Sequence, residues 1–213
     1  FHSWNVKRIQ PAIPYDLRRE NHTPLLWAFE GITSYYDDLT LVRTGLVSCP
    51  DYLDMLAKNI TRVLRNPGRQ TQSIAESSFD AWTKFYKQDE NSVNAIVSYY
   101  TKGGLVALGL DLTLRHLTQH NLSLDDVMRC LWQQFGRAQK PVAEHDILRV
   151  CSQLLKDHNI EATGIQLFTD FFNNAVYGTT ELPLEQPLRF VGVEYNLRTA
   201  NALSDNGGAT TKV

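Results

Sequence analysis

The sequence has few cysteines, no run of apolar residues long enough to span a bilayer, and no excess of charge of either sign. Its three cysteines, Cys49, Cys130 and Cys151, lie far apart without CxxC spacing. They indicate buried thiols, not a disulfide framework or a cysteine-based zinc site. The most apolar stretch is interrupted by Asp111 and Arg115, so no membrane span is expected. With 21 basic and 23 acidic side chains and no basic stripe, nucleic acid is not an expected partner either.

Helical periodicity dominates the chain. At 213 residues and 43% hydrophobic content, it can bury one large core. Apolar residues recur at helical spacing in six long segments, and a short helix is expected near Phe79 to Trp82. The six segments are residues 24–45, 51–66, 98–120, 124–136, 143–158 and 164–178. The fold class predicted from this pattern is mainly α.

Capping residues mark several of these boundaries. Thr23 followed by Pro24 predicts the start of the first helix, and Asp51 is placed to cap the second. Ser123 with Asp126 three residues later predicts a capping box. Near the end the period changes: apolar and polar residues largely alternate in 188–198, which predicts one short β element.

His2 and Glu30 are the first candidates for chemistry. A gluzincin zinc peptidase takes two His ligands from HExxH on one helix and a Glu ligand from a second helix. His2 follows Phe1 at the start of the chain, and Glu30 comes 30 − 2 = 28 positions later on an apolar helix. This spacing allows the two to meet. Taken alone, His2 is also compatible with a surface residue, and Glu30 with a carboxylate that points to solvent.

Five blocks of the chain, in order, resemble the glycyl aminopeptidase family, peptidase family M sixty-one. They read FHSWNVKRIQP, LLWAFEGITSYYDDLTLVRTGL, ESSFDAWTKFY, SYYTKGGLVALGLDLTLR and LRFVGVEYNLR. The resemblance implies the helical catalytic lobe of a thermolysin-like, gluzincin zinc metallopeptidase. It implies domain limits as well, with a catalytic region over residues 1–198. Residues 199–213 would form a polar linker toward a PDZ-like domain that the chain lacks.

The resemblance also assigns site residues. Phe1 and His2 match the last two letters of HExxH, so His2 would be the second zinc ligand and Glu30 the third. The first His ligand and the catalytic Glu would precede Phe1. Tyr100, in YTKG, would donate a hydrogen bond to the oxyanion of the tetrahedral intermediate, with Tyr99 as the fallback. Without the resemblance, both tyrosines are better interpreted as packing residues.

Four more side chains are candidates for a supporting role around the metal. Trp4 and Asn5 follow His2 closely enough to brace it. Asp37 and Asp38, two turns beyond Glu30, could orient a ligand through a hydrogen bond. The alternative for the two aspartates is a solvated helix face.

Phe79 and Trp82 are candidates for lining a small substrate pocket, because their segment falls between Glu30 and Tyr100. Aromatic packing in the core is the alternative for both.

The leading hypothesis is a fragment of a zinc aminopeptidase that removes small N-terminal residues, Gly or Ala, from peptides by means of zinc-activated water. One zinc ion is expected in the intact enzyme, and weak or no zinc in this chain, which would then be inactive by itself. The alternatives are a gluzincin aminopeptidase of broader specificity and a non-catalytic helical interaction domain. The oligomeric state and compartment stay open, with the cytoplasm slightly favoured over the periplasm.

Overall fold

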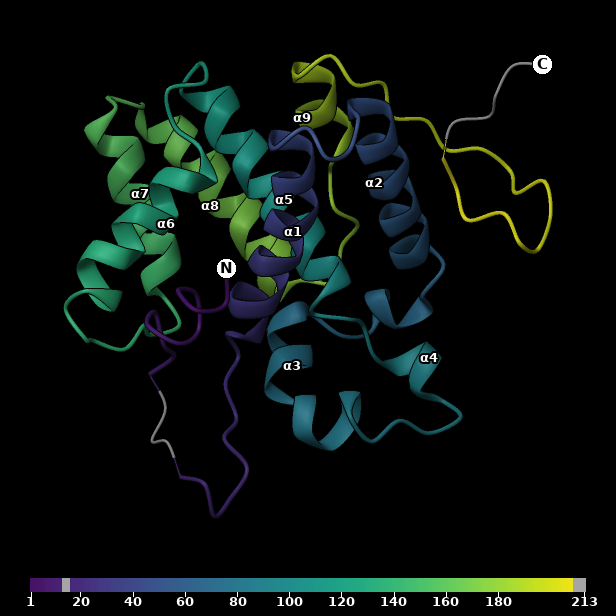
Figure 1. Ribbon diagram of the computed structural model, residues 1–213, viewed down its shortest axis with the longest axis horizontal. Coiled ribbons are helices and arrows are strands. Elements are labelled where there is room, and N and C mark those ends of the chain that lie inside the picture. Colours follow the sequence, from purple (N-terminus) through teal and green to yellow (C-terminus); the bar gives the residue numbers. More distant parts are fainter. Residues whose placement is uncertain (13–15, 209–213) are drawn as a thin grey trace.

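The computed structural model describes residues 1–12 and 16–208, and these residues fold into a bundle of helices (Figure 1). The elements in chain order are η1 Trp27–Gly31, α1 Ile32–Arg43, α2 Cys49–Leu64, η2 Pro67–Gln70, α3 Ile74–Phe79, η3 Ala81–Phe85, α4 Ser92–Ala95, α5 Thr101–Leu117, α6 Leu124–Leu131, η4 Trp132–Gly136, α7 Asp146–Asp157, α8 Ala162–Tyr177 and α9 Glu185–Phe190. The turns η1, η3 and η4 are π-helical, and η2 is a 3₁₀ turn. The predicted fold class, mainly α, is confirmed.

Helix α5 is the centre of the molecule. It packs against η1, α1, α2, α6, α8 and α9, and in Figure 1 it runs through the middle of the bundle with α6, α7 and α8 on one side and α2 and α9 on the other. Its residues from Leu105 to Leu114 are all buried, which matches an apolar pattern that surrounds the helix. The elements that carry Glu30, Asp37 and Asp38 therefore pack directly on α5.

The helix that carries Glu30 begins later than its sequence signals predict. Thr23 Oγ1 accepts a hydrogen bond from Leu25 N at 3.3 Å, but regular helix starts only at Trp27. The Trp27 N–H is capped by Ser78 Oγ of α3, at 2.9 Å. A partner 51 residues away supplies this cap, and local sequence cannot reveal it.

The other predicted helix ends vary in accuracy. Helix α1 ends at Arg43, and the predicted stop, Gly45, adopts the left-handed conformation with φ of +74°. The cap of α2 lies three residues earlier than predicted, because Ser48 Oγ accepts from Asp51 N and Ser48 is the true cap. The predicted capping box of Ser123 and Asp126 is confirmed.

The segment between α2 and α5 is more helical than the sequence predicts. A capping box of Ser73 and Glu76 starts α3, and η3 and α4 follow. The expected short helix near Phe79 to Trp82 is in fact the junction between α3 and η3.

The predicted β element near the C-terminus is wrong. Residues 185–190 form α9, which buries Leu188 against the core, and Gly192 then turns the chain with φ of +79°. A strand needs a neighbour for its backbone hydrogen bonds. Throughout the described residues, however, β-pairing is limited to two isolated bridges, Asn5 with Ile9 and Pro11 with Val142.

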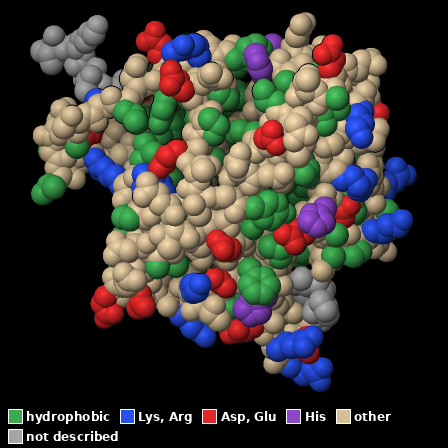
Figure 2. Space-filling view, turned by 180° about the vertical axis from the view of Figure 1, so that it is seen from behind, with side chains coloured by type: hydrophobic (Ala, Val, Ile, Leu, Met, Phe, Trp, Pro, Cys, Tyr) green, Lys and Arg blue, Asp and Glu red, His purple; other side chains and the backbone are tan. Residues whose placement is uncertain are grey.

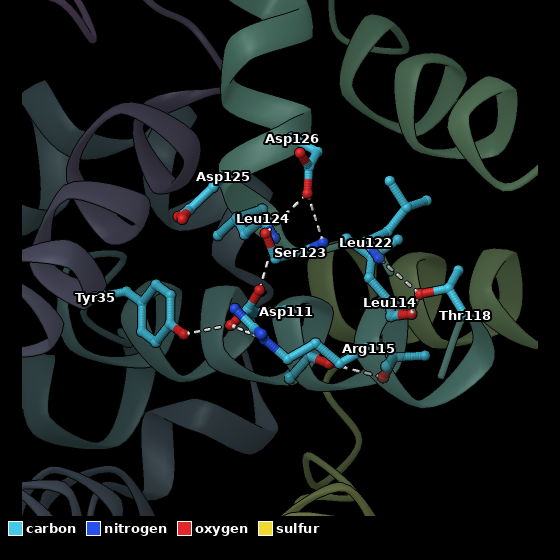
Figure 3. Close-up of polar contacts among 12 residues, drawn as sticks. Tyr35, Asp111, Leu114, Arg115, Thr118, Leu122, Ser123, Leu124, Asp125 and Asp126 are labelled. Atoms are coloured by element: carbon cyan, nitrogen blue, oxygen red, sulfur yellow. Dashed lines mark hydrogen bonds and ion pairs between the residues drawn. The ribbon is translucent and has the colours of Figure 1, made fainter. Parts of the chain in front are cut away.

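Asp111 of α5 joins three helices (Figure 3). Its carboxylate accepts hydrogen bonds from Tyr35 Oη at 2.7 Å, from Arg115 Nε at 3.0 Å and from Leu124 N at 2.6 Å. Tyr35 belongs to α1 and Leu124 to the first turn of α6. Asp111 is buried, with 3% of the residue exposed, and these hydrogen bonds offset the cost of burying its charge.

The chain after residue 198 forms a turn closed by an ion pair of Arg198 with Asp205, while the rest of the predicted linker, 209–213, lies outside the described residues.

Cys151 is buried, Cys130 half-buried and Cys49 exposed, so the expectation of buried thiols is correct for only one cysteine. None of the helices in the described part of the chain is long and apolar enough to cross a membrane. Figure 2 shows acidic and basic side chains interspersed with apolar ones over one face.

Candidate active site

His2 and Glu30 meet in the structure. His2 Nε2 lies 3.0 Å from Glu30 Oε2, and the side chains are 45% and 22% exposed. His2 comes from the N-terminal turns, whereas Glu30 belongs to η1. The sequence-predicted pair is thus assembled from two segments, at the edge of the bundle where solvent or a substrate can reach it.

Thr33 determines which nitrogen of His2 faces the carboxylate. The Thr33 hydroxyl donates its hydrogen to Phe29 O at 2.6 Å, so its oxygen can only accept from His2 Nδ1, 3.2 Å away. In the tautomer of His2 that carries its hydrogen on Nδ1, the lone pair of Nε2 is available to a metal ion. A carboxylate oxygen of Glu30 lies 3.0 Å from this nitrogen.

This donor pair fits zinc. Zinc bonds of about 2.0–2.2 Å to nitrogen and oxygen separate two ligands of a tetrahedral ion by about 3.3–3.6 Å. The observed separation of 3.0 Å is a few tenths of an ångström shorter. A hydrogen bond from the far imidazole nitrogen, here to Thr33, is the usual support of a zinc-bound histidine. Two ligands do not make a complete site, and residues 1–12 and 16–208 hold no group of three or more His, Cys, Asp or Glu side chains that could bind a metal.

Glu30 stands in a π-helical turn. Such turns hold one more residue than an α-helical turn and occur frequently at functional sites. In the next turn, Ser34 Oγ donates to Glu30 O at 2.8 Å, and Thr33 bonds to Phe29 O. The widened turn thus places the carboxylate of Glu30 and the hydroxyl of Thr33 on opposite sides of one imidazole ring, that of His2.

A pair of glycines brings the start of α5 against this turn. A Cβ on Gly31 would lie 2.6 Å from the Gly103 carbonyl carbon, and a Cβ on Gly103 would lie 3.0 Å from Gly31 Cα. Only glycine at both positions allows the backbones to approach so closely. The contact sets the start of α5, and with it Tyr100, beside the turn that carries Glu30.

Tyr99 and Tyr100 belong to a cluster of tyrosines. Their rings stack with centroids 4.6 Å apart, and Tyr86 Oη lies 3.1 Å from the hydroxyl of each. Tyr99 is fully buried, whereas Tyr100 is half-buried and lines a cavity. Burial and the hydrogen bond with Tyr86 raise the pKa of Tyr100 to about 12, and the negative charge of Glu30 acts in the same direction. Tyr100 therefore keeps its proton at neutral pH and can donate it in a hydrogen bond.

Asn5 and Trp4 hold the N-terminal turns against the bundle. The Asn5 amide is buried and donates to Ala28 O and Phe29 O, each at 3.2 Å. The Trp4 ring packs against Trp132 of η4, with ring centroids 6.1 Å apart. The bonds of Asn5 tie the segment that carries His2 to the helix that carries Glu30, and Trp4 ties it to η4.

Asp37 and Asp38 lie elsewhere than the sequence suggests. Asp38 accepts a hydrogen bond from Asn59 of α2 at 3.3 Å, and both aspartates line a cavity next to Tyr100. Besides Glu30, the side chain that contacts the His2 ring nitrogens is Thr33. The two aspartates follow Glu30 by two helical turns, about 10 Å along the axis, too far to orient a ligand of a metal held there.

Phe79 and Trp82 pack against the segment before η1. The Phe79 ring lies 5.1 Å from the His22 ring, and Trp82 Nε1 donates to Asn21 O at 3.2 Å. Both side chains are about half exposed, and neither lines the cavity beside Tyr100. Phe85 is the aromatic residue that contacts the tyrosine cluster, 4.9 Å from Tyr99 between ring centroids.

The family model of M61 glycyl aminopeptidase matches residues 1–106, which include His2, Glu30 and Tyr100. Over this range the chain belongs to the M61 glycyl aminopeptidases. The family resemblance noted in the sequence is thus confirmed.

The fold is also similar to that of a solved structure. This is a crystal structure of an aminopeptidase N family protein from Idiomarina loihiensis, with 39% identity and a TM-score of 0.89. The alignment covers 100% of the chain but 35% of the other protein, so the chain spans about a third of that relative. No curated protein sequence matches the chain.

Sequence reasoning missed three parts of the site: the Thr33 hydroxyl, the Tyr86 hydroxyl and the contact of Gly31 with Gly103. Each depends on a tertiary contact, because Thr33 meets His2 across 31 positions and Tyr86 meets Tyr100 across 14. The one available signal was the glycine that follows Glu30 in EGITS, matched by the two glycines after Tyr100 in YTKGG.

Proposed function

We propose that this chain is the helical part of a zinc aminopeptidase that removes small N-terminal residues, Gly or Ala, from peptides. The observation that carries the proposal is the contact of His2 Nε2 with Glu30 Oε2 at 3.0 Å, with the Thr33 hydroxyl 3.2 Å from the other ring nitrogen. Membership of the M61 glycyl aminopeptidases over residues 1–106 supports it. The zinc ion and the preference for small residues are inferred from the resemblance to that family.

His2 and Glu30 are the residues that would hold zinc, together with a first His ligand and a catalytic Glu from outside this chain. When bound, zinc supplies a Lewis acid and a water of lowered pKa. The chain's own contribution is to orient these ligands: Thr33 keeps a hydrogen on His2 Nδ1 and leaves Nε2 free, and Asn5 locks the loop to the helix.

The tyrosine cluster provides the hydrogen bond to the oxyanion. Each hydroxyl has one hydrogen to donate. When Tyr99 donates to Tyr86 and Tyr86 donates to Tyr100, the hydrogen of Tyr100 is free for a substrate oxygen. The negative charge that develops on that oxygen in the transition state favours this direction of the chain of hydrogen bonds.

The first test is turnover by the full-length enzyme. Tyr100→Phe removes the donor and is expected to lower kcat by about 10²–10³-fold, with little loss of zinc. Tyr86→Phe leaves the donor in place and is expected to have a smaller effect on kcat. Unchanged turnover in Tyr100→Phe would remove Tyr100 from the mechanism.

The second test concerns the metal. With two ligands of three, the 213-residue chain is expected to bind zinc weakly and to leave peptides intact. Titration with Co²⁺, followed by its visible absorption, measures the affinity in the wild-type chain and in Glu30→Gln, which should bind less. Tight stoichiometric zinc in the purified chain would contradict the predicted two-ligand site.

A gluzincin aminopeptidase of broader specificity is the second candidate function. The cavity of about 240 Å³ beside Tyr100 favours it, because a site for Gly alone needs no such space. Chromogenic amides of Gly and Ala compared with those of Leu and Arg separate the two candidates. If the full-length protein cleaves none of the four, a non-catalytic helical domain is the better description.

A further inference from the structure

A cavity of about 240 Å³ opens where α1, α2 and the start of α5 meet. Tyr100 forms part of its wall, so the cavity adjoins the candidate active site. Its volume is below the roughly 300–1,000 Å³ of sites that enclose a whole small molecule. It suits one residue of a longer ligand.

The walls of the cavity are of two kinds. Leu56, Leu105 and Leu108 supply apolar surface, and the ring of Tyr52 extends it. Carboxylates and amides lie on α1 and α2. Such a combination matches a side chain that has an apolar stem and a polar end, as lysine and arginine do.

The charge at the polar end is negative. Asp37 and Asp38 both line the cavity, and within residues 1–12 and 16–208 neither forms an ion pair. Asp38 is half-buried, with the Asn59 amide as its hydrogen-bond partner at 3.3 Å. Arg62 is exposed at the cavity and is the only basic residue among those that line it. Two carboxylates against one guanidinium leave a net charge of −1.

The distance from the candidate metal site suits a nearby residue of the same peptide. Asp37 follows Glu30 by seven positions, about 10 Å along a helix at 1.5 Å per residue. An extended peptide covers this distance in about three residues, and a lysine side chain shortens it further. A charged group in the cavity would thus belong to a residue within three positions of the cleaved bond.

We propose that this cavity is a subsite for the lysine or arginine side chain of a peptide bound at the candidate active site. The stem packs on the three leucines and Tyr52, and the cationic end lies against Asp37 and Asp38. The inference rests on the proposed function, because that function has the peptide run from the candidate metal site toward the cavity. It adds to that function a preference for basic peptides.

Binding of short peptides to the 213-residue chain tests the subsite without any need for turnover. The probes are amidated Gly-Ala-Ala-Ala peptides in which one of the last three positions carries Lys, its uncharged analogue norleucine, or Glu. Binding is followed by ¹⁵N NMR. For at least one position, the Lys peptide is expected to bind about fivefold more tightly than the norleucine peptide, and added salt should reduce the ratio.

Variants connect the preference to the cavity. In Asp37→Asn/Asp38→Asn the ratio is expected to fall to about one, with binding of the norleucine peptide retained. Asp157→Asn/Asp170→Asn changes the net charge equally on α7 and α8 and should leave the ratio unchanged. Circular dichroism establishes that each variant is folded.

Three results would overturn the proposal: equal binding of the Lys and norleucine peptides at every position, a preference that survives in Asp37→Asn/Asp38→Asn, or tighter binding of the Glu peptide through Arg62. Glu30→Gln changes a candidate zinc ligand and no residue that lines the cavity, so the Lys preference should persist in this variant. If the wild-type full-length protein shows no peptidase activity while the Lys preference persists, the proposed function is refuted and the subsite stands.

Discussion

Substituting Gly31 with alanine tests whether the close contact of two backbones holds the site together. The new Cβ would lie 2.6 Å from the Gly103 carbonyl carbon, 2.7 Å from Gly103 Cα and 3.0 Å from Tyr99 O. All three are backbone atoms, so no side chain can turn away, and the start of α5 must shift by close to an ångström. Forced overpacking of this kind costs about 1–3 kcal/mol. The better helix propensity of alanine returns up to about 1 kcal/mol.

The expected net loss in the free energy of unfolding is therefore about 1–2 kcal/mol, which lowers Tm by about 2–8 °C in a chain of this size. Thermal unfolding followed by circular dichroism measures it. Gly104→Ala is the matched control, because its Cβ would meet nothing nearer than 3.6 Å and should leave stability equal or up to about 1 kcal/mol higher. If Gly31→Ala and Gly104→Ala are equally stable, the close approach of the helices is not the constraint described above.

Three further predictions follow from single side chains. Asp111→Ala strands three donors in the core and should cost about 3–5 kcal/mol, seen as a lower urea midpoint; a loss below about 1 kcal/mol would contradict the buried network. Thr33→Val should weaken Co²⁺ binding by about tenfold, and Thr33→Ser should restore it. The pKa of Tyr100 is raised from 10.0 to about 12, so the unfolded chain loses this proton first and stability falls as pH rises from 10 to 12. Urea midpoints at pH 9 and 11 should differ less in Tyr100→Phe than in the wild-type chain.

Much of the fold could be predicted because the signals for it are local. The apolar pattern of residues 105–114 surrounds its helix, and the capping box of Ser123 and Asp126 spans four residues. The start of the Glu30 helix could not be predicted, since Ser78 caps it from another helix. The supposed strand at 188–198 failed because alternation over a few residues does not supply a second strand to pair with.

In the candidate site, too, some features could be predicted from the sequence and others could not. The family resemblance named His2, Glu30 and Tyr100, and the structure brings the first two into contact. Proximity in sequence was a poor guide to their supports, as Asp37 and Asp38 face a cavity and not the metal ligands. Thr33, one turn from Glu30, was missed because a threonine inside a helix usually bonds only to its own backbone.

The π-helical turn Trp27–Gly31 has a consequence for how this site could arise or be lost. A π turn is an α-helix with one residue inserted, and its hydrogen bonds are less favourable than those of the α form. Deleting a single residue there would let the helix close into regular α geometry. If the deleted residue is Gly31, between Glu30 and Thr33, Glu30 would also rotate by about 100° around the axis relative to Thr33. One codon thus separates a more stable helix from a turn that can present a carboxylate and a hydroxyl to the same imidazole.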